Sequence, residues 1–301
     1  MIEKHVPVLL NEVINSLDIK PHGIYVDLTL GRAGHSKEIL KKLDTGKLIC
    51  FDKDIEAINE SNKKLADINS NYFLVKSDFR YLKKELNKLG IEKVDGILAD
   101  LGVSSPQLDN KSRGFSYSQD TVLDMRMDLD NKLSASDIIN HYSEEKIVDI
   151  LYKNADVKLA KLIAKAIVEN RPINTTFELN DLLKKVLPAK IVRQKNPSKA
   201  VFQALRIEVN DELGALKALL EQIDSVLNVD GKLAIITFHS KEDAIVKNYF
   251  QQLNYYDPVL KKIPIQINKK WKQKTVFPSE DEITNNKRAR SAKLRIITRL
   301  E

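Results

Sequence analysis

The first hundred residues alternate between short runs rich in β-branched and aromatic residues and segments whose apolar residues recur at helical spacing. The strand-like runs are 24–28, 47–52, 72–75 and 94–100, and the helical segments between them are 35–44, 54–67 and 79–90. Strands that alternate with helices pair in parallel and place helices on both faces of the sheet. The pattern therefore predicts an α/β fold.

This alternation then stops. Residues from about 109 to 228 contain no strand pattern, and two helical stretches, 159–167 and 209–227, are recognised by their apolar faces. Strand patterns return at 232–238 and 294–299. The economical interpretation is one α/β core interrupted by a helical insert. The predicted core comprises 1–108 and 209–301, and the predicted insert comprises 109–208.

The cellular setting follows from what the sequence lacks. Cys50 is the single cysteine and lies in an apolar run, so an internal disulfide is excluded and a reducing compartment is expected. The N-terminus has no basic segment followed by a long apolar one, which argues against a secretion signal. No apolar segment reaches the roughly 20 residues that a membrane-spanning helix needs. We therefore expect a cytoplasmic protein with no membrane partner.

The loop after the first strand contains Gly31 and Gly34 and leads into a helix near His35. Glycines let the backbone approach a ligand, and the free N–H groups of a helix start attract an anion. Asp52 ends the second strand about 20 residues after Gly31, the spacing at which an acidic side chain reaches ribose hydroxyls. These features favour an adenosine cofactor. The simpler alternative is a loop that only packs, with Asp52 capping the next helix.

The same loop helps to choose the cofactor. It lacks the complete G-x-G-x-x-G pattern that holds the pyrophosphate of a nicotinamide cofactor. S-adenosylmethionine carries an amino acid end instead, and N–H groups at a helix start suit its carboxylate. Phe79, after the third strand, fits either a packing surface for adenine or a place in the core. The candidate residues for S-adenosylmethionine are Gly31, Ala33, Gly34, His35, Asp52 and Phe79.

The fourth strand ends at Asp100, and ligands in open α/β sheets lie at the carboxyl ends of the strands. An exocyclic amine on a base is a poor nucleophile because its lone pair is delocalised into the ring. A carboxylate that accepts a hydrogen bond from this amine draws the nitrogen toward a tetrahedral shape and takes the released proton. Asp100, Ser104, Ser105 and the backbone near Pro106 are the candidate catalytic groups. An ordinary strand-terminating turn explains the same composition.

Several motifs follow in a fixed order. They are 100–109 (D-L-G-V-S-S-P-Q-L-D), 113–116 (R-G-F-S), 123–128 (L-D-M-R-M-D), 202–210 (F-Q-A-L-R-I-E-V-N), 238–243 (F-H-S-K-E-D) and 288–291 (R-A-R-S). This series resembles the bacterial 16S ribosomal RNA cytosine-N4 methyltransferases, the ribosomal small subunit methyltransferase H or MraW family. The resemblance extends from His5 nearly to the C-terminus.

The resemblance implies a class I, Rossmann-like methyltransferase core with a helical insert. It implies methylation of a cytosine on N4 in the decoding region of the small ribosomal subunit. It also implies that Asp100 and Gln107 contact the cofactor, together with the loop residues named above.

Two features depart from the family's pattern. Its usual loop, D-G-T-F-G-R-G-G-H, has glycine where this chain has Leu28 and Ala33. Ala33 is unstrained only if its φ is negative, because a positive φ costs about 1 kcal/mol or more. Lys287 stands where the family has proline. These departures bear on cofactor affinity more than on the reaction type.

The net charge of +7 fits a polyanionic partner. Seven basic and no acidic side chains lie between Leu182 and Ile207. Residues 261–274 are similarly basic, with Trp271 and the nearby Tyr255 and Tyr256 as stacking candidates. The expected partner is 16S ribosomal RNA, and solvated basic faces are the alternative. The candidate RNA-binding residues are Lys184, Lys185, Lys190, Arg193, Lys195, Lys199, Arg206, His239, Arg288 and Arg290.

Other roles carry less support. His239 directly follows the fifth strand, where helix capping or substrate orientation fits better than a catalytic base. The remaining histidines show no metal-ligand spacing, so no metal is expected. An apolar helix face in the insert is a candidate contact surface for a homodimer. Two other functions stay open, an RNA-binding ribosome-assembly module without turnover and a nicotinamide oxidoreductase.

Overall fold

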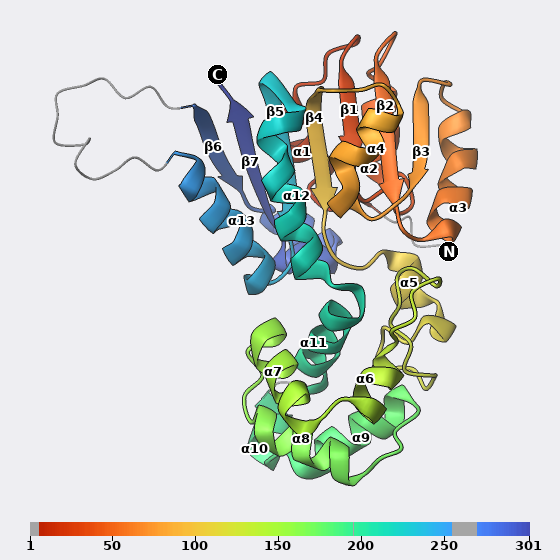
Figure 1. Ribbon diagram of the computed structural model, residues 1–301, viewed down its shortest axis with the longest axis vertical. Helices are drawn as coiled ribbons and strands as arrows, with labels where there is room; N and C mark the ends of the chain where they lie inside the picture. Colours follow the sequence, from red (N-terminus) through yellow and green to blue (C-terminus); the bar gives the residue numbers. More distant parts are fainter. Residues whose placement is uncertain (1–5, 195, 255–269) are drawn as a thin grey trace, which may run out of the picture. The chain divides into compact units, whose positions relative to one another are not determined.

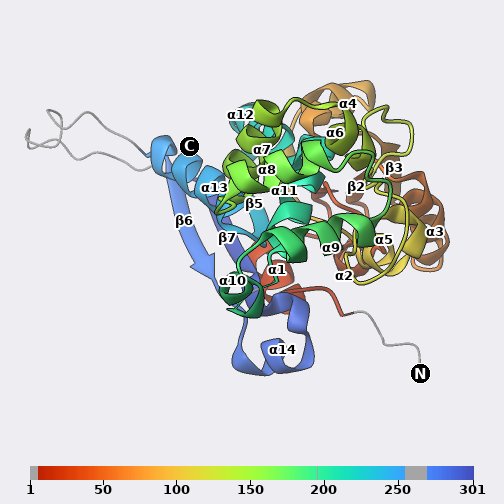
Figure 2. The same ribbon diagram turned by 90° about the horizontal axis from the view of Figure 1, so that it is seen from below.

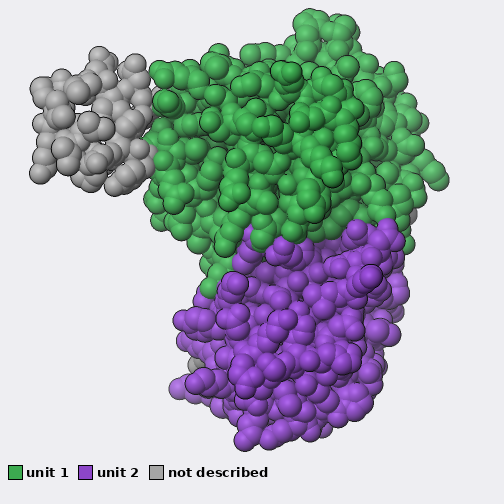
Figure 3. All heavy atoms as spheres, in the orientation of Figure 1, with its two compact units in different colours: residues 1–102, 214–301 green, residues 103–213 purple. Residues whose placement is uncertain are grey.

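The computed structural model describes residues 6–194, 196–254 and 270–301. The chain forms two compact units (Figure 3), which we call the core unit (1–102 and 214–301) and the helical unit (103–213). The helical unit extends a few residues beyond the predicted insert at both ends. One reason is that helix α11 (Ser198–Asn210) packs in that unit's own hydrophobic core up to Val209.

The core unit contains a seven-stranded sheet in the order β3-β2-β1-β4-β5-β7-β6 (Figure 1). The strands are β1 (Ile24–Asp27), β2 (Lys47–Asp52), β3 (Tyr72–Lys76), β4 (Val94–Asp100), β5 (Leu227–Thr237), β6 (Trp271–Val276) and β7 (Lys293–Arg299). The first five strands pair in parallel, and β7 runs antiparallel to β5 and β6. The predicted α/β fold, a largely parallel sheet with helices interrupted by a helical insert, is confirmed.

Helices cover both faces of this sheet (Figure 2), because alternate side chains of each strand point to opposite sides. Val26 and Ile97 pack with α4, α12 and α13, whereas Tyr25 and Leu48 pack with α1, α2 and α3. The helices are α1 (Leu10–Leu17), α2 (Gly34–Leu40), α3 (Ile55–Ala66), α4 (Leu82–Lys88), α12 (Glu212–Val226), α13 (Ser240–Leu253) and α14 (Glu280–Asn285), with 3-10 turns η1 (Phe79–Tyr81) and η4 (Lys287–Ser291). No helix among the described residues has the length and apolar character needed to cross a bilayer.

Strand β6 was not predicted. It lies at the edge of the sheet, and Lys272, Gln273 and Lys274 are all exposed, so the strand lacks alternating apolar residues. Trp271, predicted as a stacking partner for RNA, is instead 4% exposed and packs in the sheet's core. The stacking prediction for Trp271 was therefore wrong, and the other two candidates, Tyr255 and Tyr256, lie outside the described residues.

The single helix predicted over 209–227 is two helices. Asp211 adopts a left-handed backbone with φ 45° between α11 and α12, which ends the hydrogen-bond ladder of α11. Apolar spacing continues across the break because each helix has its own core to face. Val209 packs in the helical unit, whereas Leu216 packs against the sheet.

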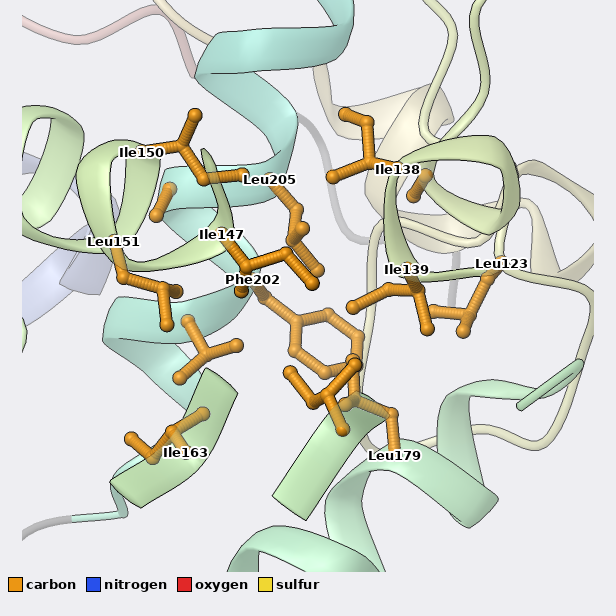
Figure 4. Close-up of a cluster of buried hydrophobic side chains, with 14 of the residues drawn as sticks. Leu123, Ile138, Ile139, Ile147, Ile150, Leu151, Ile163, Leu179, Phe202 and Leu205 are labelled. Carbon is orange, nitrogen blue, oxygen red and sulfur yellow. The ribbon is translucent and has the colours of Figure 1, made fainter. Parts of the chain in front are cut away.

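The helical unit has an independent hydrophobic core (Figure 4), in which Phe202 lies among Ile138, Ile147 and Leu179 from three other helices. Its helices are α5 (Ser105–Asp109), α6 (Ala135–His141), α7 (Glu144–Ala155), α8 (Ala160–Glu169), α9 (Thr176–Val186), α10 (Ala189–Gln194) and α11, with a 3-10 turn η2 (Lys111–Arg113). The described part of the unit contains no strand, in agreement with the sequence pattern.

Candidate functional site

Parallel strands of the core unit end in acidic residues at one edge of the sheet. β1 ends at Asp27, β2 at Asp52 and β4 at Asp100, and Asp78 follows β3. Ligands of open α/β sheets bind at this edge. The described residues contain no group of three or more His, Cys, Asp or Glu side chains that could hold a metal ion.

The predicted cofactor loop connects β1 to α2 through two left-handed residues, Gly31 with φ 48° and Ala33 with φ 59°. The strain considered for Ala33 is therefore present, at about 1 kcal/mol or more. Gly34 has to be glycine, because a Cβ there would lie 2.3 Å from Cγ of Pro7. Leu28, the other residue that replaces a glycine of the family's loop, is buried in the sheet's core. No side chain among the described residues caps α2. The N–H of Ala33 donates to the carbonyl of Leu30 (2.7 Å).

Asp52 anchors this loop with both carboxylate oxygens. Oδ2 accepts a hydrogen bond from the N–H of Gly31 and Oδ1 accepts one from the N–H of Asp54, each at 2.9 Å. Asp54, rather than Asp52, caps α3, so the capping alternative for Asp52 was wrong. Burial raises the pKa of Asp52 to about 6, although these hydrogen bonds oppose the increase. Asp52 thus ties the end of β2 to the predicted cofactor loop.

We expect Asp52→Asn to weaken binding of S-adenosylmethionine about ten-fold. An asparagine has one acceptor oxygen, so either Gly31 or Asp54 would lose its acceptor and the loop would shift. Isothermal titration calorimetry measures the change. Asp67→Asn, which removes an exposed carboxylate just after α3, is the matched control. Equal affinities of the two variants would contradict a role for Asp52 in cofactor binding.

Asp78 and Phe79 lie where β3 leads into η1. Oδ1 of Asp78 accepts the N–H of Arg80 (2.9 Å), and Oδ2 lies 3.2 Å from Nζ of Lys53. Burial would raise the pKa of Asp78, but Lys53 and Arg80 outweigh burial and lower it. Phe79 is half-buried against the sheet's core. It therefore packs on the core and keeps part of its surface exposed at this edge.

Asp100 combines a fixed backbone with an unpaired oxygen. Its N–H donates to Oγ1 of Thr29 (2.7 Å), which joins the end of β4 to the cofactor loop. Oδ1 is buried and has no hydrogen-bond partner among the residues that the structure describes. Burial, followed by the nearby Asp27 and Glu242, raises the pKa of Asp100 to about 8. A buried acceptor without a donor is destabilising, so this atom is suited to a ligand that brings one.

His35 and Asp27 are buried close to the same strand end. Nδ1 of His35 lies 3.8 Å from Oδ2 of Asp100, and Nε2 lies 3.1 Å from the carbonyl of Val8. Asp27 accepts a hydrogen bond from Oγ of Ser36 (2.6 Å), and burial raises its pKa. Asp27 carries no local signal of a functional site, because its strand pattern alone predicts only a core position.

Glu242 is a second residue at this site without a predicted role, although it lies within the motif 238–243. It is 2% exposed and accepts the N–H of Phe238 (2.8 Å). Its Oε1 lies 3.1 Å from Nε2 of His239, and His239 caps α13. The described contacts of His239 are thus those of a helix cap, and its predicted RNA contact stays a prediction.

The residues after Asp100 enter the helical unit. The N–H of Ser104 donates to Oε1 of Gln107 (3.1 Å), and Ser105 is the first residue of α5. Pro106 lies in the first turn of α5, where a missing N–H does no harm. Gln107 is 6% exposed. These contacts build a helix start, while the predicted catalytic and cofactor roles of these residues stay predictions.

The predicted RNA-binding residues differ in availability. Lys195 lies outside the described residues. Arg206 forms a double hydrogen bond with Glu212 at 2.8 and 3.0 Å, so it is occupied within the helical unit. Glu212 lies just beyond the stretch without acidic residues, which is why the sequence pattern did not predict this pair. The exposed members are Lys184, Lys185, Lys190, Arg193 and Lys199 in the helical unit and Arg288 and Arg290 in the core unit.

Two motifs, 123–128 and 202–210, hold the helical unit together. Asn210 is buried, and its Oδ1 accepts the N–H of Met127 (2.8 Å) while its Nδ2 donates to the carbonyl of Met125 (2.8 Å). The contacts of these motifs are therefore structural.

Known proteins are similar in sequence to this chain over its whole length. Residues 2–300 match the MraW methylase family. A protein named "Ribosomal RNA small subunit methyltransferase H" from Metamycoplasma arthritidis (strain 158L3-1) is 66% identical over 94% of this chain and 99% of its own length. Proteins of the same name from Mycoplasmopsis synoviae (strain 53) and Mycoplasmopsis agalactiae (strain NCTC 10123 / CIP 59.7 / PG2) are 53% and 54% identical over 100% of both chains.

Proposed function

Because the chain belongs to the MraW methylase family, whose members use S-adenosylmethionine, we propose that it methylates N4 of a cytosine in 16S ribosomal RNA. The names of its relatives support a small-subunit ribosomal RNA substrate. The motif 100–109 resembles that of cytosine-N4 enzymes, which act in the decoding region. The observation that carries the proposal is the buried Oδ1 of Asp100 at the ligand edge of the sheet, which has no hydrogen-bond partner in the described part of the chain. Such a substrate also favours a cytoplasmic location.

Asp100 is the proposed catalytic group. S-adenosylmethionine supplies an electrophilic methyl group when bound. The Asp100 carboxylate accepts a hydrogen bond from an N–H of the cytosine amine, which draws the nitrogen lone pair out of conjugation with the ring. The same carboxylate then takes the proton that the amine releases. A pKa near 8 makes this carboxylate a stronger base than an ordinary aspartate. Ser104, Ser105 and the backbone near Pro106 orient the amine in this proposal, although the Ser105 side chain lies outside the described part of the structure.

The cofactor is held by groups from several strand ends. The start of α2 at Ala33, Gly34 and His35 binds its carboxylate. The N–H of Ala33 itself donates to the carbonyl of Leu30 (2.7 Å), so this contact depends on the N–H groups that follow it. Asp52 binds the ribose hydroxyls and Phe79 packs on the adenine. Gly31 shapes the loop, and Gln107 and Asp100 complete the cofactor contacts.

The helical unit is the proposed RNA-recognition domain. Its exposed Lys184, Lys185, Lys190, Arg193 and Lys199 supply phosphate contacts, and Arg288 and Arg290 supply more from the core unit. Arg206 contributes least, because binding phosphate would require it to leave Glu212.

The raised pKa of Asp100 makes methyl transfer depend on pH. We expect kcat/KM to rise about ten-fold per pH unit below pH 8 and to level off above it, because only the ionised carboxyl accepts a proton. Initial rates with methyl-labelled S-adenosylmethionine between pH 6 and 9.5 measure the profile. A flat profile with chemistry shown to be rate-limiting would contradict Asp100 as the base.

Mass spectrometry of ribosomal RNA nucleosides tests the product. RNA from small subunits incubated with the protein and cofactor should gain N4-methylcytidine, whereas RNA incubated with heat-inactivated protein should not. A gain on another atom or base would contradict the proposed specificity.

The strain at Ala33 favours a second candidate function, an RNA-binding module without turnover. Calorimetry distinguishes the two, because the enzyme should release heat with S-adenosylmethionine below millimolar concentration and the module should not.

A further inference from the structure

An open, positively charged hollow lies on the core unit outside the site described above. Its volume is about 640 Å³, and its lining includes Arg80, Lys83, Lys84 and Lys88 from η1 and α4. The described residues that line it also include Tyr81 and Gln222, and none of them is acidic. A concave surface lined by cations and one aromatic side chain matches a polyanion that also carries flat rings.

The backbone beneath this hollow is held in place. Gln222 of α12 donates from Nε2 to the carbonyl of Arg80 and accepts the N–H of Lys83 at Oε1, both at 2.9 Å. Leu82 and Leu86 anchor α4 in the sheet's core. The turn from η1 to α4 therefore presents its cations from a fixed backbone, which lowers the entropy lost on binding.

Two of the four cations already have carboxylate partners. Nε of Arg80 lies 3.3 Å from Oδ1 of Asp78, and Nζ of Lys88 lies 2.8 Å from Oε1 of Glu85. Lys83 and Lys84 are exposed and have no ion-pair partner among the residues that the structure describes. These two lysines are thus the groups available for phosphates.

Tyr81 adds a flat surface beside the lysines. Its side chain is 50% exposed, and Nζ of Lys84 lies 5.7 Å from the ring centroid. A tyrosine exposed to this extent offers a stacking face for an unpaired base, and stacking does not depend on which base it is.

The position of the hollow connects it to the reaction. β3 ends at Lys76 and η1 begins at Phe79, so Tyr81 lies in the connection that leaves the carboxyl edge of the sheet, the edge at which β4 ends at Asp100. We propose that the hollow binds single-stranded ribosomal RNA next to the target nucleotide, with phosphates on Lys83 and Lys84 and a base on Tyr81. This inference rests on the proposed function and adds an RNA contact on the core unit.

The test compares two double variants of equal charge. Lys83→Gln/Lys84→Gln removes the proposed contacts, and Lys42→Gln/Lys63→Gln removes two exposed lysines associated with the opposite face of the sheet. The probe is a fluorescent 16S RNA fragment spanning the decoding region, titrated at several salt concentrations. We expect the first variant alone to lose about ten-fold in affinity at 0.1 M salt and to lower the salt slope by about 1.4. Tyr81→Leu should weaken binding about ten-fold with an unchanged slope.

Further measurements separate this inference from the proposed function. In the Lys83→Gln/Lys84→Gln variant, KM for RNA should rise while kcat and the affinity for S-adenosylmethionine stay at wild-type values. Equal RNA affinity and salt slope in the two double variants would overturn the inference and leave the methyltransferase proposal intact. An RNA affinity that depends on Lys83 and Lys84, in a protein that does not methylate, would support the hollow and overturn the proposed function.

Discussion

Asp100→Asn is expected to fold and bind S-adenosylmethionine but to lose at least 100-fold in kcat/KM. Asparagine keeps the size of the side chain and the backbone hydrogen bond to Thr29, but it cannot take a proton. General base catalysis contributes about 10²–10⁴-fold to rates, which sets the expected loss. The measurement is initial rates with methyl-labelled S-adenosylmethionine and small-subunit RNA, with calorimetry for cofactor affinity.

Asp95→Asn provides the matched control, because Asp95 lies on the same strand and accepts the N–H of Ile24 (2.8 Å) near the opposite edge. It should lower stability and leave the rate per folded molecule unchanged. Normal turnover in Asp100→Asn would remove Asp100 from the mechanism.

The same substitution should change how stability depends on pH. The pKa of Asp100 is raised from an ordinary value near 4 to about 8, so the folded protein holds a proton that the unfolded chain releases. Ionisation of Asp100 therefore lowers the free energy of unfolding of the wild type as pH rises from about 4 to 8. Asp100→Asn has no carboxyl group to ionise, so its stability should not fall for this reason. At pH 8 the variant should be more stable by roughly 2–5 kcal/mol. Urea denaturation at pH 5 and pH 8 measures the free energy of unfolding of both proteins. The same difference between variant and wild type at the two pH values would contradict the raised pKa.

The second large effect is expected for Asn210→Ala, which should destabilise the helical unit by roughly 2–5 kcal/mol. The substitution removes the partners of the Met127 N–H and the Met125 carbonyl, both bonded to the buried Asn210 side chain. Met125 has φ 61°, so its segment depends on these bonds to keep its conformation. Hydrogen exchange of amides 123–128 and urea denaturation measure the loss.

Asn170→Ala is the control for this prediction. Asn170 makes one side-chain hydrogen bond, to the carbonyl of Ala166 (2.8 Å), at the end of a helix in the same unit. It should cost less than about 1 kcal/mol. An equal loss in the two variants would show that Asn210 has no special part in holding the motif.

The strands and most helices could be predicted because their signal is local. A strand buried on both faces has to be apolar where it is buried, as 48–51 of β2 are, whatever its neighbours are. Edge strand β6 carries no such signal, because exposed Lys272 and Lys274 face solvent. The break at Asp211 was equally hidden, since the apolar spacing on its two sides looks continuous although two different cores cause it.

The sequence by itself determined the order of strands and helices, the insertion after β4, the acidic strand ends and the motifs that mark the family, because these depend on local periodicity and residue identity. The tertiary structure decided which of these groups have partners. It pairs Arg206 with Glu212, buries Trp271 and leaves Oδ1 of Asp100 unpaired among the described residues. Such outcomes depend on contacts between residues far apart in the chain or on burial in the folded protein, which no local pattern records.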